Sequence, residues 1–214
     1  MNTDISAVLW DFGGVILSSP FEAFNDYEVA AGLPKDLVRT INATNPNTNA
    51  WAMLERSEVD HGEFCALFNA EALALGHQVD ADKVMRMLHG SVRPEMVAAL
   101  DRVKAAGFAT ALLTNNFVSN ATKIDPKRDA EIRAIIARFD AVVESSVVGV
   151  RKPDPAFYER ACELLDVKPS ACVFLDDLGV NLKPAAAMGM RTIKVLNAAQ
   201  ALDDLEAIIG IALR

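Results

Sequence analysis

The sequence predicts an α/β fold: a Rossmann-like parallel sheet flanked by helices, with an all-helical cap inserted after the first strand. Three observations predict it. Short apolar runs recur along the chain, helical patterns separate the later runs, and a long stretch after the first run has apolar positions only at helical spacing. Strands that alternate with helices form parallel βαβ units, so a single parallel sheet is expected.

The first strand is expected at Ile5 to Trp10, an apolar and partly β-branched run. It ends at Asp11 and leads into Gly13 and Gly14, a pair that favours a tight turn. Asp11 is therefore expected at the carboxyl end of a buried strand.

The helical insertion is expected between about Phe21 and His89, where Leu37 and Ile41 illustrate the helical spacing. The chain returns to the sheet at Arg93, because the proline that follows disfavours helical geometry at the residue before it.

Two domains follow from this organisation. Residues 1–16 and 94–214 are predicted to form the α/β core domain, and residues 17–93 the helical cap domain. The length suits one core with a modest insertion.

For the rest of the core, the sequence predicts four more strands and three helices. The strands are Ala109–Leu113, Ala141–Val143, Cys172–Leu175 and Arg191–Val195. The helices are Pro94–Ala106, Asp154–Leu165 and Asn181–Met188. The polar segment Phe117–Arg133 is predicted as a long surface loop that leads into a helix ending near Phe139.

Composition excludes several classes of protein. Among 214 residues, 51% are hydrophobic and 23% charged, which is typical of a globular protein and not of a disordered one. A net charge of −8 disfavours nucleic acid as a partner. No apolar run approaches the ~18 residues of a membrane span, and the first residues lack the basic start of a signal peptide.

The cysteines indicate a reducing compartment. There are three, Cys65, Cys162 and Cys172, and this odd number without regular spacing disfavours a disulfide framework or a zinc site. We expect each to be a small buried residue. The sequence thus predicts a cytoplasmic protein, and its acidic charge and scattered apolar residues leave both a monomer and a homodimer open.

Polar clusters follow the ends of the predicted strands or come just before a helix. They are Asp11-Phe12-Gly13-Gly14, Thr114-Asn115, Arg151-Lys152-Pro153, and Asp176-Asp177 with Asn181. The ligand site of an open parallel sheet lies outside the carboxyl ends of its strands, so we expect these clusters to converge.

In this order the clusters resemble the four motifs of the haloacid dehalogenase-like hydrolase superfamily: a nucleophilic aspartate, a threonine or serine, a lysine and an acidic metal motif. The segments RPEMVAAL, GVRKPDPAFYERA and FLDDLGVNLKPAAAMGM are most similar to the branch with bacterial sugar-phosphate phosphatases and the amino-terminal phosphatase domain of soluble epoxide hydrolase. The resemblance covers essentially the whole chain and implies a Mg²⁺-dependent phosphatase acting on a small organic phosphate ester.

The resemblance also implies site roles. Asp11 would be the nucleophile that forms an aspartyl-phosphate. Mg²⁺ would be held by Asp11, Asp177 and the carbonyl of Gly13. Asp176 is a supporting or alternative metal ligand, and Asn181 falls where the family often has a second acidic residue.

The phosphate would be bound by Thr114, by the backbone N–H that follows it at Asn115, and by Lys152. The hydroxyl of Thr114 and the ammonium of Lys152 would also stabilise the negative charge that shifts in the transition state, so both are implied to be catalytic.

Gly13 departs from the family pattern, because most family phosphatases carry an aspartate there as general acid and base. Loss of such a group typically lowers the rate by ~10²–10⁴. The resembled branch also has members with glycine at this position, so a phosphatase is still expected, with its proton donor unassigned.

Two alternatives remain open. One is a 2-haloacid dehalogenase, which Asp177 disfavours because the dehalogenases of this superfamily lack the acidic metal motif. The other is a low-turnover regulatory module that binds a phosphometabolite, which Gly13 favours.

Other polar residues are predicted to have structural roles. His61, His77 and His89 have no nucleophile partner at a recognisable spacing and are expected to be surface or satisfied cap residues. The polar stretch from Glu55 to His61 is predicted as a solvated connection between cap helices, with contact to the site as the alternative. Arg151 is expected to point away from the site.

Overall fold

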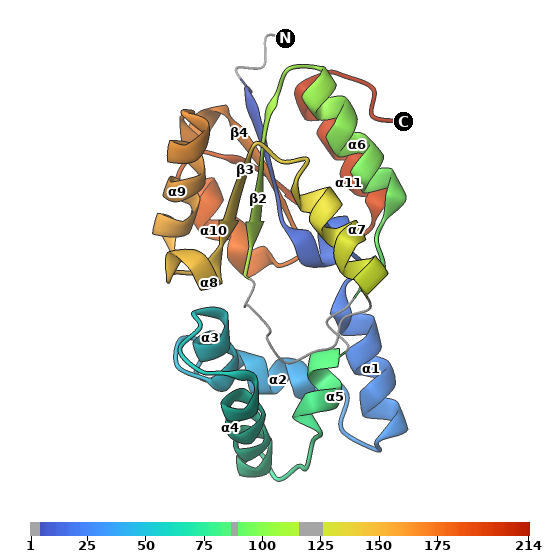
Figure 1. The fold of residues 1–214 in the computed structure, drawn as a ribbon, viewed down its shortest axis with the longest axis vertical. Helices are drawn as coiled ribbons and strands as arrows, with labels where there is room; N and C mark the ends of the chain where they lie inside the picture. Colours follow the sequence, from blue (N-terminus) through green and yellow to red (C-terminus); the bar gives the residue numbers. More distant parts are fainter. Residues whose placement is uncertain (1–4, 87–89, 116–125) are drawn as a thin grey trace.

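The chain forms a parallel sheet with helices on both faces and a group of helices beyond its carboxyl edge, as seen in the computed structural model (Figure 1). The structure describes residues 5–86, 90–115 and 126–214. Within these ranges the sheet has five strands in the order β3-β2-β1-β4-β5, and every neighbouring pair is parallel. The predicted fold class is confirmed.

The strands lie close to their predicted positions. They are β1 (Ala7–Trp10), β2 (Ala109–Thr114), β3 (Ala141–Glu144), β4 (Cys172–Asp176) and β5 (Arg191–Lys194). β1 and β4 are buried along their whole length, as expected for central strands covered on both faces. Their continuous apolar runs made them recognisable in the sequence.

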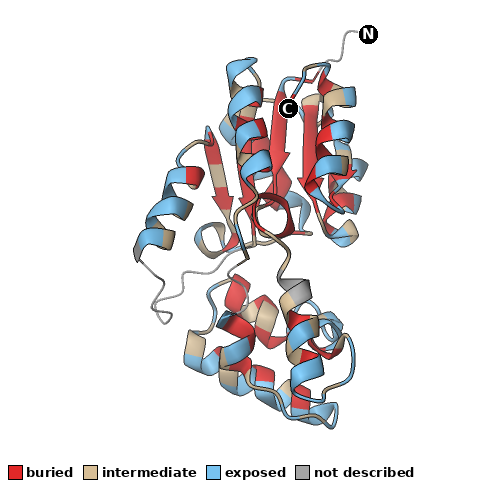
Figure 2. Ribbon diagram, turned by 90° about the vertical axis from the view of Figure 1, so that its right-hand side faces the viewer, coloured by how far each residue is buried: buried red, intermediate tan, exposed pale blue. Residues whose placement is uncertain are grey.

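Helices cover both faces of the sheet (Figures 1 and 2), and alternate side chains of β1 belong to two apolar clusters, one on each face. Val8 and Trp10 pack with one set of helices, α6 (Pro94–Ala105), α7 (Pro126–Ile136) and α11 (Ala198–Ile209). Ala7 and Leu9 pack with the other set, α9 (Pro155–Leu165) and α10 (Gly179–Ala187).

Two features of the core differ from the sequence analysis. Helix α7 begins at Pro126, so the prediction of a loop as far as Arg133 is wrong from that proline onward, while residues 117–125 lie outside the described ranges. Helix α11 was not predicted. The side chain of Asn197 caps it by accepting a hydrogen bond from the backbone of Gln200 at 2.9 Å.

Beyond the sheet lie the helices that we call the cap segment. They are α1 (Pro20–Ala30), α2 (Leu37–Ala43), α3 (Ala50–Glu55), α4 (His61–Ala74) and α5 (Ala81–Arg86). Their described residues contain no strand, and they enclose an apolar cluster of their own that includes Phe64 and Phe68. The division of the chain into two domains stays a prediction. His89 lies outside the described ranges.

The two connections between sheet and cap segment run side by side. Leu17 and Val92 form an antiparallel bridge, and the backbone N–H of Ser18 donates to the carbonyl of Ser91 at 2.7 Å. The N–H of Arg93 donates to the carbonyl of Ile16 at 2.9 Å. We call residues 17–19 and 90–93 the linker pair.

Two smaller predictions concern membranes and cysteines. None of the described helices has both the length and the apolar character needed to cross a membrane. Cys162 and Cys172 are buried, but Cys65 is partly exposed, so the expectation of burial is wrong for that residue because α4 lies at the surface of the cap segment.

Candidate active site

Three carboxylates meet where β1 and β4 end. These strands pair directly, with Trp10 opposite Leu175, so the residues that follow them emerge side by side. Asp11, Asp176 and Asp177 each offer an oxygen, and these three oxygens lie within 4.8 Å of one another. The expected convergence of polar clusters therefore occurs for these residues.

A buried lysine joins this group. Lys152 is 1% exposed, and its Nζ lies 2.8 Å from Oδ1 of Asp11 and 2.8 Å from Oδ2 of Asp176. When all of them are ionised, three carboxylates and one ammonium leave two net negative charges among these four side chains. Such an excess is unfavourable in a buried site unless a cation compensates it.

The backbone of Lys152 is held by Asn115. The side-chain amide of Asn115 donates to the carbonyl of Lys152 at 2.9 Å, and the N–H of Lys152 donates to Oδ1 of Asn115 at 2.8 Å. Thr114, the last residue of β2, is 8% exposed and directly precedes Asn115. The side chain of Asn115 is therefore occupied in fixing the position of Lys152, whereas the phosphate contact through its backbone N–H stays a prediction.

Asp176 is fully buried and supports the site. Its Oδ1 accepts a hydrogen bond from the N–H of Leu178 at 2.7 Å, and the amide of Asn181 lies 3.1 and 3.0 Å from its two oxygens. The carbonyl of Asn181 accepts a 2.6 Å hydrogen bond from Tyr158. Because both oxygens of Asp176 have partners, this carboxylate positions Lys152 and is poorly placed to ligate a metal.

Sequence reasoning missed Tyr158, since it lies in the middle of α9 and looks like any buried aromatic residue. Only its hydroxyl distinguishes it. A buried hydroxyl needs a partner, and the hydroxyl of Tyr158 donates to the backbone carbonyl of Asn181.

The two glycines in the turn after β1 differ in backbone conformation and in the space around them. Gly14 has φ +77°, and a Cβ there would lie 2.2 Å from Oδ2 of Asp177, so only glycine fits. Gly13 has φ −70°, and no heavy atom lies within 4 Å of where its Cβ would be. The N–H of Phe12 donates to Oδ1 of Asp11 at 2.6 Å, which fixes the carboxylate at the start of the turn.

Burial and mutual repulsion set the protonation of these groups. Burial raises the pKa of Asp11 well above its usual value, and Asp176 and Asp177 add to the shift although Lys152 opposes it. Burial, followed by the charge of Asp176, raises the pKa of Asp177 to about 6. For Lys152, burial alone would lower the pKa, but the carboxylates of Asp11 and Asp176 raise it, so the lysine stays charged.

This donor set fits a divalent cation. Asp11 and Asp177 supply hard oxygen ligands, a doubly charged ion would balance the two excess negative charges, and Mg²⁺ prefers one or two carboxylates with other oxygen ligands. Among the described residues, Oδ2 of Asp11 has no hydrogen-bond partner, so one oxygen of the predicted nucleophile remains available.

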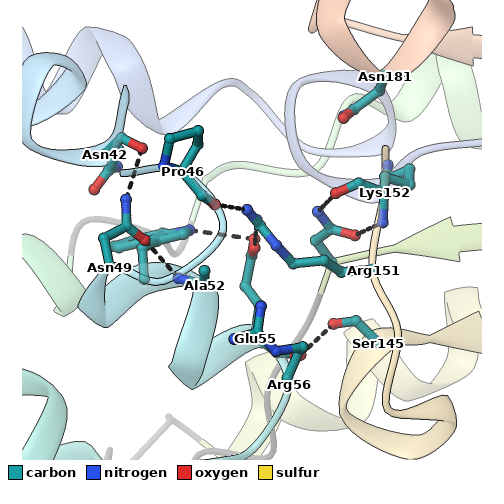
Figure 3. Close-up of polar contacts among 12 residues, drawn as sticks. Asn42, Pro46, Asn49, Ala52, Glu55, Arg56, Ser145, Arg151, Lys152 and Asn181 are labelled. Carbon is teal, nitrogen blue, oxygen red and sulfur yellow. Dashed lines mark hydrogen bonds and ion pairs between the residues drawn. The ribbon is translucent and has the colours of Figure 1, made fainter. Parts of the chain in front are cut away.

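The burial of Glu55 shows that one prediction is wrong. This residue was assigned to a solvated connection, but it is 6% exposed and forms an ion pair with Arg151 (Figure 3). Arg151 points away from Asp11 and into the cap segment, as expected. The prediction holds better for Arg56 and Glu58, which pair with each other near the surface, and for His61, whose Nε2 lies 3.1 Å from Asp82.

The match to a family model decides the family. Residues 5–189 match the haloacid dehalogenase-like hydrolase model. The chain belongs to this family. It is a hydrolase-family protein with phosphatases among its relatives.

Two mammalian relatives are larger proteins. The chain is 30% identical over 97% of its length to acyl-CoA dehydrogenase family member 10 of Mus musculus, covering 19% of that protein. It is 32% identical over 94% of its length to bifunctional epoxide hydrolase 2 of Mus musculus, covering 38% of it. The chain thus spans about a fifth to two fifths of these relatives.

A fungal relative has the same extent as this chain. A sesquiterpene phosphatase of Aspergillus oryzae is 25% identical over 98% of the chain and 100% of its own length. Among solved structures, a HAD family enzyme of Bacteroides thetaiotaomicron in complex with magnesium and inorganic phosphate has a TM-score of 0.56 at 16% identity, covering 90% of this chain and 96% of that one.

An L-2-haloacid dehalogenase of Xanthobacter autotrophicus with chloropropionic acid covalently bound has the same TM-score, 0.56, at 20% identity, covering 97% of this chain and 84% of that one. Both structural matches bear on the fold alone. They leave the choice between phosphatase and dehalogenase to the residues of the site.

Proposed function

We propose that the protein is a Mg²⁺-dependent phosphatase that hydrolyses a small organic phosphate through an aspartyl-phosphate on Asp11. The observation that carries the proposal is the buried group of three carboxylates and one lysine, with two negative charges in excess. A site that is to receive an anionic phosphate needs a cation to offset this charge, and hard oxygen ligands select magnesium.

Each residue has a role in this proposal. Oδ2 of Asp11 attacks phosphorus as the ester P–O bond breaks, and the leaving oxygen takes a proton from solvent; water then hydrolyses the aspartyl-phosphate, which releases inorganic phosphate and restores Asp11. Asp11, Asp177 and the carbonyl of Gly13 would hold the metal. When bound, the ion would polarise a phosphate oxygen and offset the charge of the attacking carboxylate. Lys152 and the Thr114 hydroxyl bind equatorial phosphate oxygens.

The remaining residues hold Lys152 in place. Asp176 accepts from its ammonium at 2.8 Å, and Asn115 holds its backbone, so the lysine does not have to be ordered when substrate arrives. Asn181 keeps Asp176 oriented.

The relatives support a phosphatase, since a sesquiterpene phosphatase matches over its full length. Dehalogenation is less compatible with this site, because it proceeds without a metal ion and would leave the excess negative charge of the buried carboxylates without a counterion. We further propose that the partner is a small phosphate ester, not nucleic acid, and that the protein acts in the cytoplasm.

The test is release of inorganic phosphate from a panel of sugar phosphates, acyl phosphates and an activated aryl phosphate, with Mg²⁺ and with EDTA. We expect metal-dependent release that Asp11→Asn abolishes, because the amide cannot attack phosphorus at a useful rate. Glu58→Gln, which removes a carboxylate from the cap-segment surface, serves as the matched control and should behave like the wild type.

Full activity of Asp11→Asn would refute the covalent mechanism. If the wild type releases no phosphate from any compound of the panel but binds phosphate in calorimetry, the result would support the low-turnover binding module instead of the phosphatase. Halide release from 2-haloacids that persists in EDTA would instead support the dehalogenase.

A further inference from the structure

The candidate site is closed to a substrate in this structure. Asp11 is 8% exposed and Lys152 is 1% exposed, so the proposed nucleophile offers almost no surface to solvent. The cap segment lies across the carboxyl edge of the sheet (Figures 1 and 2), and the hydroxyl of Ser19, at its entrance, donates to Oδ2 of Asp177 at 3.2 Å. A small molecule can reach Asp11 only if this arrangement opens.

The cap segment is held to the core on two sides. On one side the linker pair is covalently continuous and cross-bonded through Leu17, Ser18, Ser91 and Val92. On the other side, where α3 lies next to α8 (Ser145–Val148) in Figure 1, the contact is noncovalent. Opening must therefore break the noncovalent side and pivot about the linker pair.

On the noncovalent side, the described residues include a group of polar contacts that we call the cap contact, formed by Glu55, Pro46, Ser145 and Arg151 (Figure 3). The guanidinium of Arg151 donates to the carboxylate of Glu55 and to the carbonyl of Pro46. The hydroxyl of Ser145, which is fully buried, donates to the backbone carbonyl of Glu55 at 2.6 Å. Core residues thus bind both the side chain and the backbone of one cap residue.

A cavity borders the cap contact. It has a volume of about 320 Å³ and is lined by Asn47 and Arg56 from the cap segment and by Gly149, Arg151 and Asp154 among core residues. Because cap segment and core do not touch across this cavity, apolar packing there contributes little to holding them together. The hydrogen bonds of Glu55 therefore contribute a larger share of the attachment on this side.

We propose that the cap contact is the latch that holds the cap segment closed over Asp11, and that Arg151 is a positioning residue that links closure to the neighbouring Lys152. Arg151 and Lys152 are adjacent in the chain, and their side chains go to the cap segment and to the nucleophile respectively. When the latch closes, it fixes the backbone beside the lysine that Asn115 also holds.

The test measures opening directly in the full-length protein without substrate. Spin labels at Leu73→Cys on α4 and Leu164→Cys on α9, both exposed positions, report the distance between cap segment and core. Cys65→Ser removes the partly exposed native thiol. Arg151→Gln and Ser145→Ala each weaken the latch from the core side, so helix α3 keeps its own sequence.

We expect a single short distance in the parent protein and a growing population of longer distances in the variants. Removing hydrogen bonds to a charged group should shift the ratio of open to closed molecules about 10- to 100-fold for Arg151→Gln, and removing the neutral bond about 2- to 10-fold for Ser145→Ala. Glu58→Gln is the matched control: it breaks the pair of Arg56 and Glu58 within the cap segment and should leave the distances unchanged.

Unchanged distances in both latch variants, with circular dichroism equal to that of the parent, would overturn the inference. Opening in Glu58→Gln to the same extent would also overturn it, because any change near α3 would then loosen the cap segment. The inference adds a way into the site to the proposed function, but the experiment needs no turnover. It can therefore succeed or fail independently of phosphatase activity.

Discussion

The two glycines after the predicted nucleophile allow a prediction in which the same substitution has opposite effects at adjacent positions. Gly14→Ala places a methyl group 2.2 Å from Oδ2 and 2.3 Å from Cγ of Asp177, with φ at +77°. Gly13→Ala places it where no heavy atom lies within 4 Å, with φ at −70° and ψ at 132°.

The magnitudes follow from these geometries. A left-handed alanine costs roughly 1–2 kcal/mol, and forcing an extra carbon into a filled space costs about 1–3 kcal/mol. Gly14→Ala should therefore lower the free energy of unfolding by ~2–5 kcal/mol, which at 2–4 °C per kcal/mol is a fall in Tm of about 5–20 °C. Gly13→Ala should raise it by about 0.4–1 kcal/mol, because it restricts only the unfolded chain.

The assay is thermal and urea unfolding of both variants and the wild type in EDTA, followed by Mg²⁺ titration. Gly14→Ala should also weaken Mg²⁺ binding, since the methyl group displaces the carboxylate of Asp177, whereas Gly13→Ala should bind Mg²⁺ like the wild type. Equal stability of the two variants, with Mg²⁺ binding unchanged in both, would refute the close packing of Gly14 against Asp177.

Two further predictions concern charge. Lys152→Met should destabilise the protein by ~3–5 kcal/mol, because it leaves Asp11 and Asp176 buried without their cation; urea unfolding measures this, and a loss below ~1 kcal/mol would contradict the ion pairs. The pKa of Asp177, raised to about 6, means that the folded protein binds a proton that the unfolded chain releases above pH ~4. Stability in EDTA should therefore be greatest at low pH and decline as pH rises through about 6, while the extra stability conferred by Mg²⁺ should grow over the same interval, because the metal competes with that proton. Tm values with Mg²⁺ and with EDTA from pH 5 to 8 test this, and a constant difference between them would contradict it.

The sequence predicts the strands and the converging polar residues well, for a physical reason. A central parallel strand must be apolar throughout, and the first polar residue after it marks the edge of the sheet, so Asp11 and Asp176 reveal their positions locally. The order of four motifs then identifies the family.

What the sequence could not predict depends on distant partners. Glu55 stands in a polar stretch and looks solvated, but its ion-pair partner is 96 residues away, and no local pattern reports that distance. The helix that ends near Phe139 was predicted, but its start at Pro126 was missed, because a run of charged residues after proline is equally typical of a loop and of the first turn of an exposed helix. In each case tertiary contacts, not local preference, decide the outcome.

The bridge between Leu17 and Val92 has a consequence for how such a protein can diversify. Because the inserted helices leave and re-enter the sheet at neighbouring points, the ends of the insertion could be joined by a short turn without moving any strand. The helices also have an apolar cluster separate from those of the sheet. A lineage can therefore exchange or enlarge the whole insertion, and with it the surface that faces the sheet edge, while the carboxylates and the lysine at that edge keep their geometry.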